Sequence, residues 1–248
     1  MISETDGVIL SRVRMPDDRT MLVLFTRKYG KISAGTGIRL NGKNKSSLAL
    51  RVFTHGRYEL FFGAKTCNVN TAETINSFFR ISEDVDKYMT ASYILEYTNR
   101  LLPEGQPNEQ LFDMLIDLLG MIERRKQKMS TLTLVYQIKS LECCGYFPRI
   151  ERCVSCGAPL GEDFIFSVAD GGGLCKKCIN KIKPDKHLIY DMKFDIIRAL
   201  KSIQNNNIRR FENLALSDDI YCRLNEITKA YMSYHIGIDR LKSENYLV

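Results

Sequence analysis

The sequence lacks the features that mark secreted and membrane proteins. No apolar run approaches the eighteen or so residues that cross a bilayer, and the strongest, Met21 to Phe25, has the length of a strand. Residues Met1 to Asp6 contain neither the basic nor the apolar segment of a signal peptide. We therefore expect a cytoplasmic protein that does not bind membranes. In that reducing compartment, paired cysteines are more often metal ligands than disulfides.

Motifs of hydrolytic enzymes are also missing. The chain has three histidines and contains neither G-x-S-x-G nor H-E-x-x-H. Residues Gly37 to Lys43 match G-x-x-x-x-G-K, but Asn44 stands where a phosphate loop needs Ser or Thr, and a β-like run follows instead of a helix. We predict no catalytic residues and no enzymatic activity. A nucleotide hydrolase stays as an alternative that a phosphate-release assay would remove.

Positive charge is concentrated in the first third of the chain. The net charge is +7, and residues 1–80 hold thirteen Lys and Arg against six Asp and Glu, whereas the rest of the chain is balanced. This asymmetry indicates a polyanionic partner for the first third. The alternative is a basic, solvated surface without a partner.

The first 80 residues have the pattern of a small β-barrel. Short β-rich runs separated by turn signals predict five strands, at 8–13, 20–26, 32–34, 48–53 and 58–62. Glycine at the corners favours a closed barrel over a sandwich. An OB-fold is the leading prediction, and an SH3-like barrel would give a similar pattern.

After residue 80 the apolar pattern changes to helical spacing. Ser82 is expected to cap the first helix, and later helices are expected around 111–126, 134–141, 194–203 and 220–231. The predicted fold class is α+β, with an N-terminal OB-fold β-barrel at 1–80. An all-helical domain at 81–248 follows and carries an inserted zinc knuckle with four cysteine ligands at about 150–181.

Four of the eight cysteines form the most specific motif. Cys153, Cys156, Cys175 and Cys178 have the spacing C-x2-C-x18-C-x2-C. Two thiolates three residues apart on a tight turn can reach one ion, and two such turns complete a tetrahedron. Four sulfurs leave no position for water, so we predict one structural Zn²⁺ and no catalytic metal.

Cations and aromatic rings alternate in the segment between the third and fifth predicted strands. Five cations fall within twenty residues: Arg39, Lys43, Lys45, Arg51 and Arg57. Phe53 and Tyr58 lie among them, and cations with rings are what binding of single strands requires. The alternative is that the rings belong to the core and only the charges are exposed, which is the expected arrangement for Phe53.

The order of these parts resembles that of a known family. The matching segments are Gly145 to Pro148 before the cysteines, the four cysteines themselves with the triple glycine at 171–173, Leu24 to Lys31, Ser92 to Glu96, and Tyr231 to Ile236 with Leu241 to Ser243. Over nearly its whole length the chain resembles the RecO family of bacterial DNA repair proteins. It departs from the family in the loop after Arg39, where a compact basic and serine-containing segment is usual.

The resemblance implies a fold and a function. RecO-like proteins have an OB-fold, a helical domain and a zinc knuckle. They bind single- and double-stranded DNA, anneal complementary strands, and act with RecR, often with RecF, to load RecA onto strands coated by single-strand-binding protein. A groove between helices is expected to hold the C-terminal tail of single-strand-binding protein, and the protein is expected to associate with the nucleoid.

The site residues follow by the same resemblance. It assigns metal binding to Cys153, Cys156, Cys175 and Cys178. It assigns DNA binding to the basic barrel residues Arg39, Lys43, Lys45, Arg51 and Arg57, with Lys28 and Lys31 as secondary candidates.

Two further classes stay open from the residues alone. A zinc-ribbon regulatory factor that binds RNA would prefer an RNA hairpin to single-stranded DNA. An adaptor whose basic barrel meets an acidic protein would bind no nucleic acid at physiological salt.

Overall fold

The computed structural model describes residues 1–15, 20–38, 45–126, 128–179 and 188–246. The chain forms two compact units. Unit 1 comprises Met1–Met129 and Leu241–Val248, and unit 2 comprises Ser130–Arg240. Unit 1 thus contains the first strands together with helices that follow them. The boundary near residue 80 that the sequence suggests between two domains stays a prediction.

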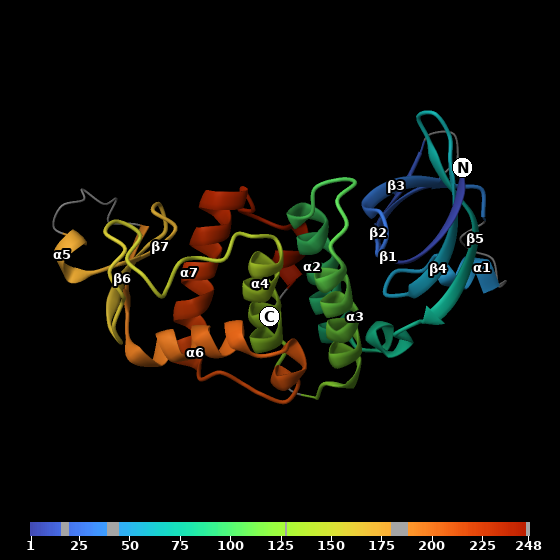
Figure 1. The fold of residues 1–248 in the computed structure, drawn as a ribbon. Helices are drawn as coiled ribbons and strands as arrows, with labels where there is room; N and C mark the ends of the chain where they lie inside the picture. The colour runs from blue at the N-terminus through green and yellow to red at the C-terminus, as the bar shows by residue number, and fades with distance from the viewer. Residues whose placement is uncertain (16–19, 39–44, 127, 180–187, 247–248) are drawn as a thin grey trace. The chain divides into compact units, whose positions relative to one another are not determined.

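Five strands in unit 1 form a closed barrel (Figure 1). They are β1 (Ile2–Arg14), β2 (Thr20–Thr26), β3 (Gly30–Thr36), β4 (His55–Phe62) and β5 (Cys67–Asn76). Neighbours follow the order β1-β2-β3-β5-β4, and β1 also pairs with β4, so every strand has a partner on both sides. The contact between β3 and β5 is parallel and the others are antiparallel. The α+β class with an N-terminal barrel is confirmed.

The predicted strand at 48–53 is wrong. A short helix, α1 (Lys45–Ala49), occupies its first part and a turn follows. Ala49 and Leu50 are fully buried in the barrel core, and the Tyr58 hydroxyl donates to the Ala49 carbonyl oxygen at 2.9 Å. Leu48 and Arg51 on either side of this buried pair are exposed, and so short a segment gives no period by which a helix differs from a strand, so the sequence pattern could not separate them.

The sequence pattern missed β5. Its inward residues are Val69 and Ala72, which pack in the barrel core. They are three positions apart because the register to β4 shifts between Glu59 and Leu60, which leaves an extra residue on β5. This irregularity removes the strict alternation by which a strand is recognised.

Unit 1 continues with helices. They are η1 (Phe79–Glu83), α2 (Val85–Leu101) and α3 (Glu109–Arg124). The expected cap at Ser82 is wrong, because the Asp84 side chain accepts the hydrogen bond from the Lys87 amide at 3.1 Å. Asn108 caps α3 in the same way, by accepting from the Leu111 amide at 2.9 Å.

A late segment of the chain returns to unit 1. The Glu96 carboxylate on α2 accepts hydrogen bonds from the backbone amides of Lys242 and Ser243, each at 2.9 Å, and from the Ser243 hydroxyl at 2.6 Å. Burial acts to raise the pKa of Glu96, but these bonds outweigh it and hold the pKa below its usual value. The start of η4 (Lys242–Tyr246) is thereby fastened to α2.

Unit 2 contains the remaining elements. They are α4 (Ser130–Cys143), β6 (Phe164–Ser167), β7 (Gly172–Leu174), α5 (Lys176–Ile179), β8 (Ile189–Met192), α6 (Phe194–Asn205), η3 (Ile208–Phe211) and α7 (Asp218–Ile236). Strands β7, β6 and β8 form a three-stranded sheet in that order. The helices predicted around 134–141, 194–203 and 220–231 correspond to α4, α6 and α7. Among the described residues, none of the helices has the length and hydropathy of a membrane span.

Candidate metal centre and nucleic-acid interface

The four cysteines of the motif come together in unit 2. The sulfurs of Cys153, Cys156, Cys175 and Cys178 all lie within 4.8 Å of one another. The Sγ atoms of Cys156 and Cys175 are 3.8 Å apart, far beyond the length of a disulfide bond, and none of the eight cysteines, all of them among the described residues, forms a disulfide. This cluster can hold one metal ion. We call residues 149–179 around it the knuckle.

Two tight turns aim the sulfurs at a common point. In the first, the Gly157 amide donates to the Cys153 carbonyl oxygen at 2.9 Å, and Gly157 has a positive φ of 74° that a glycine adopts without strain. In the second, the Cys178 amide donates to the Cys175 carbonyl oxygen at 2.9 Å. The turns are joined, since the Cys175 amide points at the Cys153 sulfur at 3.4 Å.

Within the cluster, the electrostatics favour the thiolate form of Cys153. Burial acts to raise the pKa of the Cys153 thiol, but hydrogen bonds from the amides of Cys175, Cys156 and Ser155 outweigh it and lower the pKa to about 6. A thiolate is the form of cysteine that binds metals. The knuckle therefore presents a metal-binding form of Cys153 near neutral pH.

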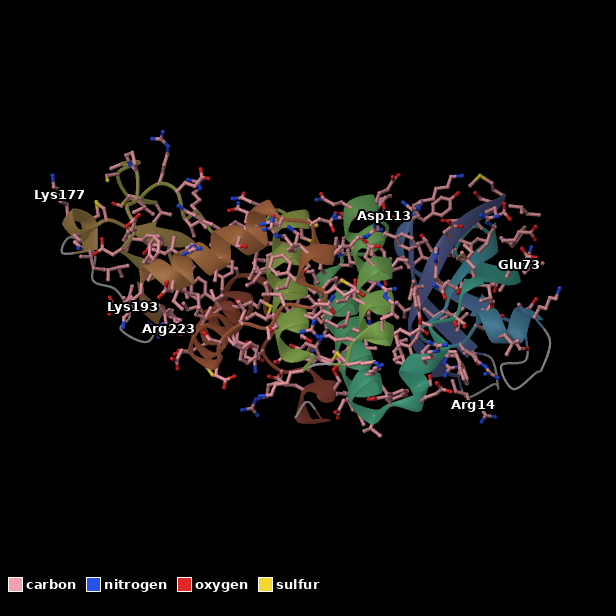
Figure 2. All side chains as sticks on the ribbon, turned by 90° about the horizontal axis from the view of Figure 1, so that it is seen from below. Arg14, Glu73, Asp113, Lys177, Lys193 and Arg223 are labelled. Atoms are coloured by element: carbon pink, nitrogen blue, oxygen red, sulfur yellow. The ribbon has the colours of Figure 1, made fainter. Side chains whose placement is uncertain are left out.

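Glycines allow the knuckle to pack tightly. A Cβ atom on Gly172 would lie 2.3 Å from the Arg149 carbonyl oxygen, and one on Gly173 would lie 2.3 Å from a side-chain carbon of Leu160. The buried cluster that results is small: Cys153, Leu174 and Cys178. Lys177 on α5 points away from it (Figure 2).

The predicted DNA-binding cations of the barrel differ in their surroundings. Arg39 and Lys43 lie outside the described residues. Lys45 is the first residue of α1 and Arg51 lies two residues after its end; both are exposed and form no ion pair with any described residue. Arg57 on β4 is exposed too, but its Nε lies 3.3 Å from Asp6 Oδ1.

The secondary candidates Lys28 and Lys31 already have partners. Lys31 Nζ donates to the Asn99 carbonyl oxygen of α2 at 2.8 Å and is partly buried. Lys28 Nζ donates to the Ser3 hydroxyl at 3.2 Å and stays exposed. Their neighbour Arg27 forms an ion pair with Asp113 on α3, which raises the pKa of the guanidinium. The hairpin between β2 and β3 thus joins the barrel to the helices of unit 1.

Acidic side chains gather on one outward face of the barrel. Glu4 on β1 is the partner of Glu59 on β4, and Arg57 lies between Asp6 and Glu73 on the two neighbouring strands. Tyr58 and Leu60 point into the core, so the intervening residues of β4 point outward. Glu73 projects from β5 into solvent (Figure 2). We call Glu4, Asp6, Glu59 and Glu73 the acidic face, and Arg57 is the cation within it.

The acids of the barrel are grouped along the sequence. The chain has no acidic residue between Asp18 and Glu59, a stretch that includes all the predicted DNA-binding residues. Its described part spans β2, β3, α1 and the start of β4. The four acids of β1, β4 and β5 are therefore the acids of the barrel that the structure describes.

The two aromatic rings interleaved with the cations are core residues. Phe53 is 2% exposed and meets Tyr88 of α2 edge to face, with 5.3 Å between ring centroids. Tyr58 is fully buried, and its pKa is raised by that burial. The alternative interpretation, in which Phe53 and Tyr58 belong to the core, is thus correct for both rings. Neither ring is available on the surface beside the exposed cations of this segment.

Unit 2 also has an apolar hollow. Residues of α4, β6, α6 and α7 form most of its wall, including Leu141, Phe166, Leu200, Leu224 and Tyr231. Its lining is almost entirely apolar. The sequence pattern did not identify this hollow, because it showed the apolar faces of single helices and not which faces meet.

Two family models match the chain. The model described as "Recombination protein O N terminal" matches residues 1–78, and the model described as "Recombination protein O C terminal" matches residues 82–245. The barrel, the helices and the cysteine knuckle are therefore those of a DNA repair protein that serves recombination. The chain belongs to the RecO family.

Curated relatives agree over nearly the full length. The chain is 28% identical to the DNA repair protein RecO of Alkaliphilus metalliredigens over 243 residues, which are 95% of this chain and 94% of that protein. It is 27% identical to the RecO protein of Thermoanaerobacter sp., with 98% and 96% covered. It is 25% identical to that of Halalkalibacterium halodurans, with 100% and 94% covered.

Proposed function

We propose that this protein is a recombination mediator. It binds single- and double-stranded DNA, anneals complementary strands, and acts with RecR, and with RecF, to load RecA onto strands coated by single-strand-binding protein. It makes and breaks no covalent bond, so it is not an enzyme. It works in the cytoplasm, at the nucleoid.

Exposed cations that form no ion pair with a described residue carry this proposal. A polyanion that approaches α1 and the residues just after it meets Lys45 and Arg51, whereas one that approaches the acidic face is repelled by its carboxylates. Lysine and arginine that approach phosphates release condensed counterions, which gives affinity without reading sequence. The same cations screen the repulsion between two strands, which lets complementary bases meet.

We propose that the knuckle holds one Zn²⁺ through its four cysteines. Four sulfurs at about 2.3 Å from one zinc ion form a tetrahedron whose corners are roughly 3.8 Å apart. The 3.8 Å between the sulfurs of Cys156 and Cys175 supports this geometry. Such an ion is saturated by protein ligands and supplies folding energy to the knuckle, with no position left for a substrate.

We propose, by the family resemblance, that a groove between helices binds the tail of single-strand-binding protein. The apolar hollow of unit 2 is not that groove, because its volume is about 20 Å³ and the side chains that line it are buried. A competition assay between a peptide of the tail and the full-length tail of single-strand-binding protein tests the proposal.

A matched pair of arginine variants tests the DNA-binding surface. Arg51→Ala and Arg57→Ala each remove one exposed positive charge, but Arg51 forms no ion pair with a described residue and Arg57 lies in the acidic face. On a single strand, the slope of log K against log salt should fall by about 0.7 for Arg51→Ala. For Arg57→Ala it should stay near that of the unaltered protein.

The slope is measured by fluorescence anisotropy of a labelled mixed-sequence strand across a salt series. Equal losses for the two variants, or a larger loss for Arg57→Ala, would place the DNA on another surface. Absence of binding by the unaltered protein at low salt would contradict the DNA-binding function itself.

A further inference from the structure

The barrel has few aromatic rings to offer to a nucleobase. Residues 1–80 contain no tryptophan and eight rings of phenylalanine and tyrosine. Four of them are at most 3% exposed: Phe25, Phe53, Tyr58 and Phe78. Tyr29 and Phe62 are partly buried and pack on each other, with 4.9 Å between ring centroids.

The remaining two rings of residues 1–80 belong to other elements than the cations of α1, and a further exposed ring of unit 1, Tyr88 of α2, packs on Phe53 and is 41% exposed. Phe61 is 41% exposed, but it lies on the outward side of β4 two residues beyond Glu59, in the row that carries the acidic face. Phe79 is 56% exposed and belongs to η1, beyond the last strand of the barrel. Neither ring is interleaved with Lys45 and Arg51.

The segments of the barrel that lie outside the described residues add no ring. By sequence, residues 16–19 are Pro, Asp, Asp and Arg, and residues 39–44 are Arg, Leu, Asn, Gly, Lys and Asn. The segment from residue 39 to Arg51 therefore contains four cations and no aromatic side chain at all. Its exposed apolar side chain in the described part is Leu48, at 40%.

We infer that the basic surface of the barrel binds a DNA strand through its sugar-phosphate backbone alone and leaves the bases free to pair while the strand stays bound. This inference rests on the proposed function and specifies which part of the ligand is recognised. Proteins that hold single strands by stacking lose about five- to 150-fold in affinity for each stacked base that is removed. A strand held by stacking must also leave the ring before its base can pair. A strand held by phosphates presents its bases to a complementary strand without that step.

Abasic strands separate the two modes of binding. The full-length, metal-loaded protein is titrated with a labelled twenty-nucleotide strand and with the same strand in which the central bases are replaced by abasic sites. Both carry the same number of phosphates. We expect dissociation constants within twofold of each other and equal salt slopes, because the cations meet the same charges.

The outcomes are distinct from those for the proposed function. If the ordinary strand binds and the abasic strand binds more than tenfold more weakly, the inference is wrong and the DNA-binding function stands. If neither strand binds, the proposed function fails and the inference fails with it.

Ring removal gives an independent check. The triple variant Phe61→Ala, Phe79→Ala and Tyr88→Ala removes the two exposed rings of residues 1–80 and the exposed ring that packs on Phe53, and it should bind the ordinary strand with unchanged affinity. Arg51→Ala, the matched control, should lower the salt slope in the same assay. A loss of affinity in the ring variant with no loss for Arg51→Ala would overturn backbone-only binding.

Discussion

The barrel and the knuckle achieve their folds by opposite means. In the barrel, every strand is paired on both sides and ten buried residues form a continuous core. In the knuckle, the buried cluster has three members, and two of them are the predicted metal ligands Cys153 and Cys178. Strand β7 there has three residues. The barrel therefore has a continuous core of its own, whereas we expect the knuckle to depend on the metal ion that our proposal assigns to its thiolates.

The two regions also differ in the kind of residue pattern on which their proposed functions depend. In our proposal, the knuckle binds its ion through four side chains, and the replacement of any one of them removes a ligand. The barrel would bind DNA through a distribution of charge, with cations at α1 and just after it and carboxylates on β1, β4 and β5. The spacing of four cysteines therefore predicts the candidate site of the knuckle, whereas the charge count of a whole region predicts that of the barrel.

The largest effect is expected from removing a metal ligand. Cys153→Ser should release the ion and unfold the knuckle, because binding of structural zinc contributes on the order of 10–16 kcal/mol in zinc-finger peptides. Metal content by atomic emission should fall, and amide hydrogen exchange should rise in β6 and β7 while the barrel strands stay protected. Cys222→Ser, at an exposed position of α7, is the control and should keep the metal. Exchange that rises equally in the barrel would contradict the independence of the two regions.

The converse change removes packing from the barrel. Leu24 is fully buried in the barrel core, so Leu24→Ala should cost about 2–5 kcal/mol of the free energy of unfolding of unit 1. Leu48→Ala, at a half-exposed leucine of α1, should change it by less than about 0.5 kcal/mol. Denaturant unfolding followed by exchange of the barrel amides measures both. Loss of metal in Leu24→Ala would show that the knuckle needs the barrel.

A smaller effect is expected from a methyl group in the knuckle. Gly172→Ala places a carbon against the Arg149 carbonyl oxygen and should cost about 1–3 kcal/mol, since a backbone atom must move. Gly161→Ala adds the same methyl group where nothing lies within 4 Å and should be neutral. A chelator titration measures the difference, as weaker metal retention in Gly172→Ala. Equal retention in the two variants would mean that the knuckle tolerates this shift.

Much of the fold could be predicted from sequence because its patterns are local. The apolar run of β2, the helical spacing of α3 and the cysteine spacing each depend on residues close together in the chain. The helix at Lys45–Ala49 and the bulged strand β5 could not be predicted, because burial inside a closed barrel and a register shift against β4 decide them. The charges of the interface were visible in the sequence. The ion pair of Arg57 and the burial of Tyr58 depend on strands that are distant in sequence.

The hydrogen bonds of Glu96 to Lys242 and Ser243 have a consequence for biosynthesis. Unit 1 begins at Met1 but includes a segment that is translated after all of unit 2. A ribosome that has completed the barrel and helices α2 and α3 leaves the carboxylate of Glu96 without these partners until residue 243 emerges. Unit 2 is thus an insertion within the sequence of unit 1. The hydrogen bonds between Glu96 and residues 242–243 can form only after all of unit 2 has been synthesised.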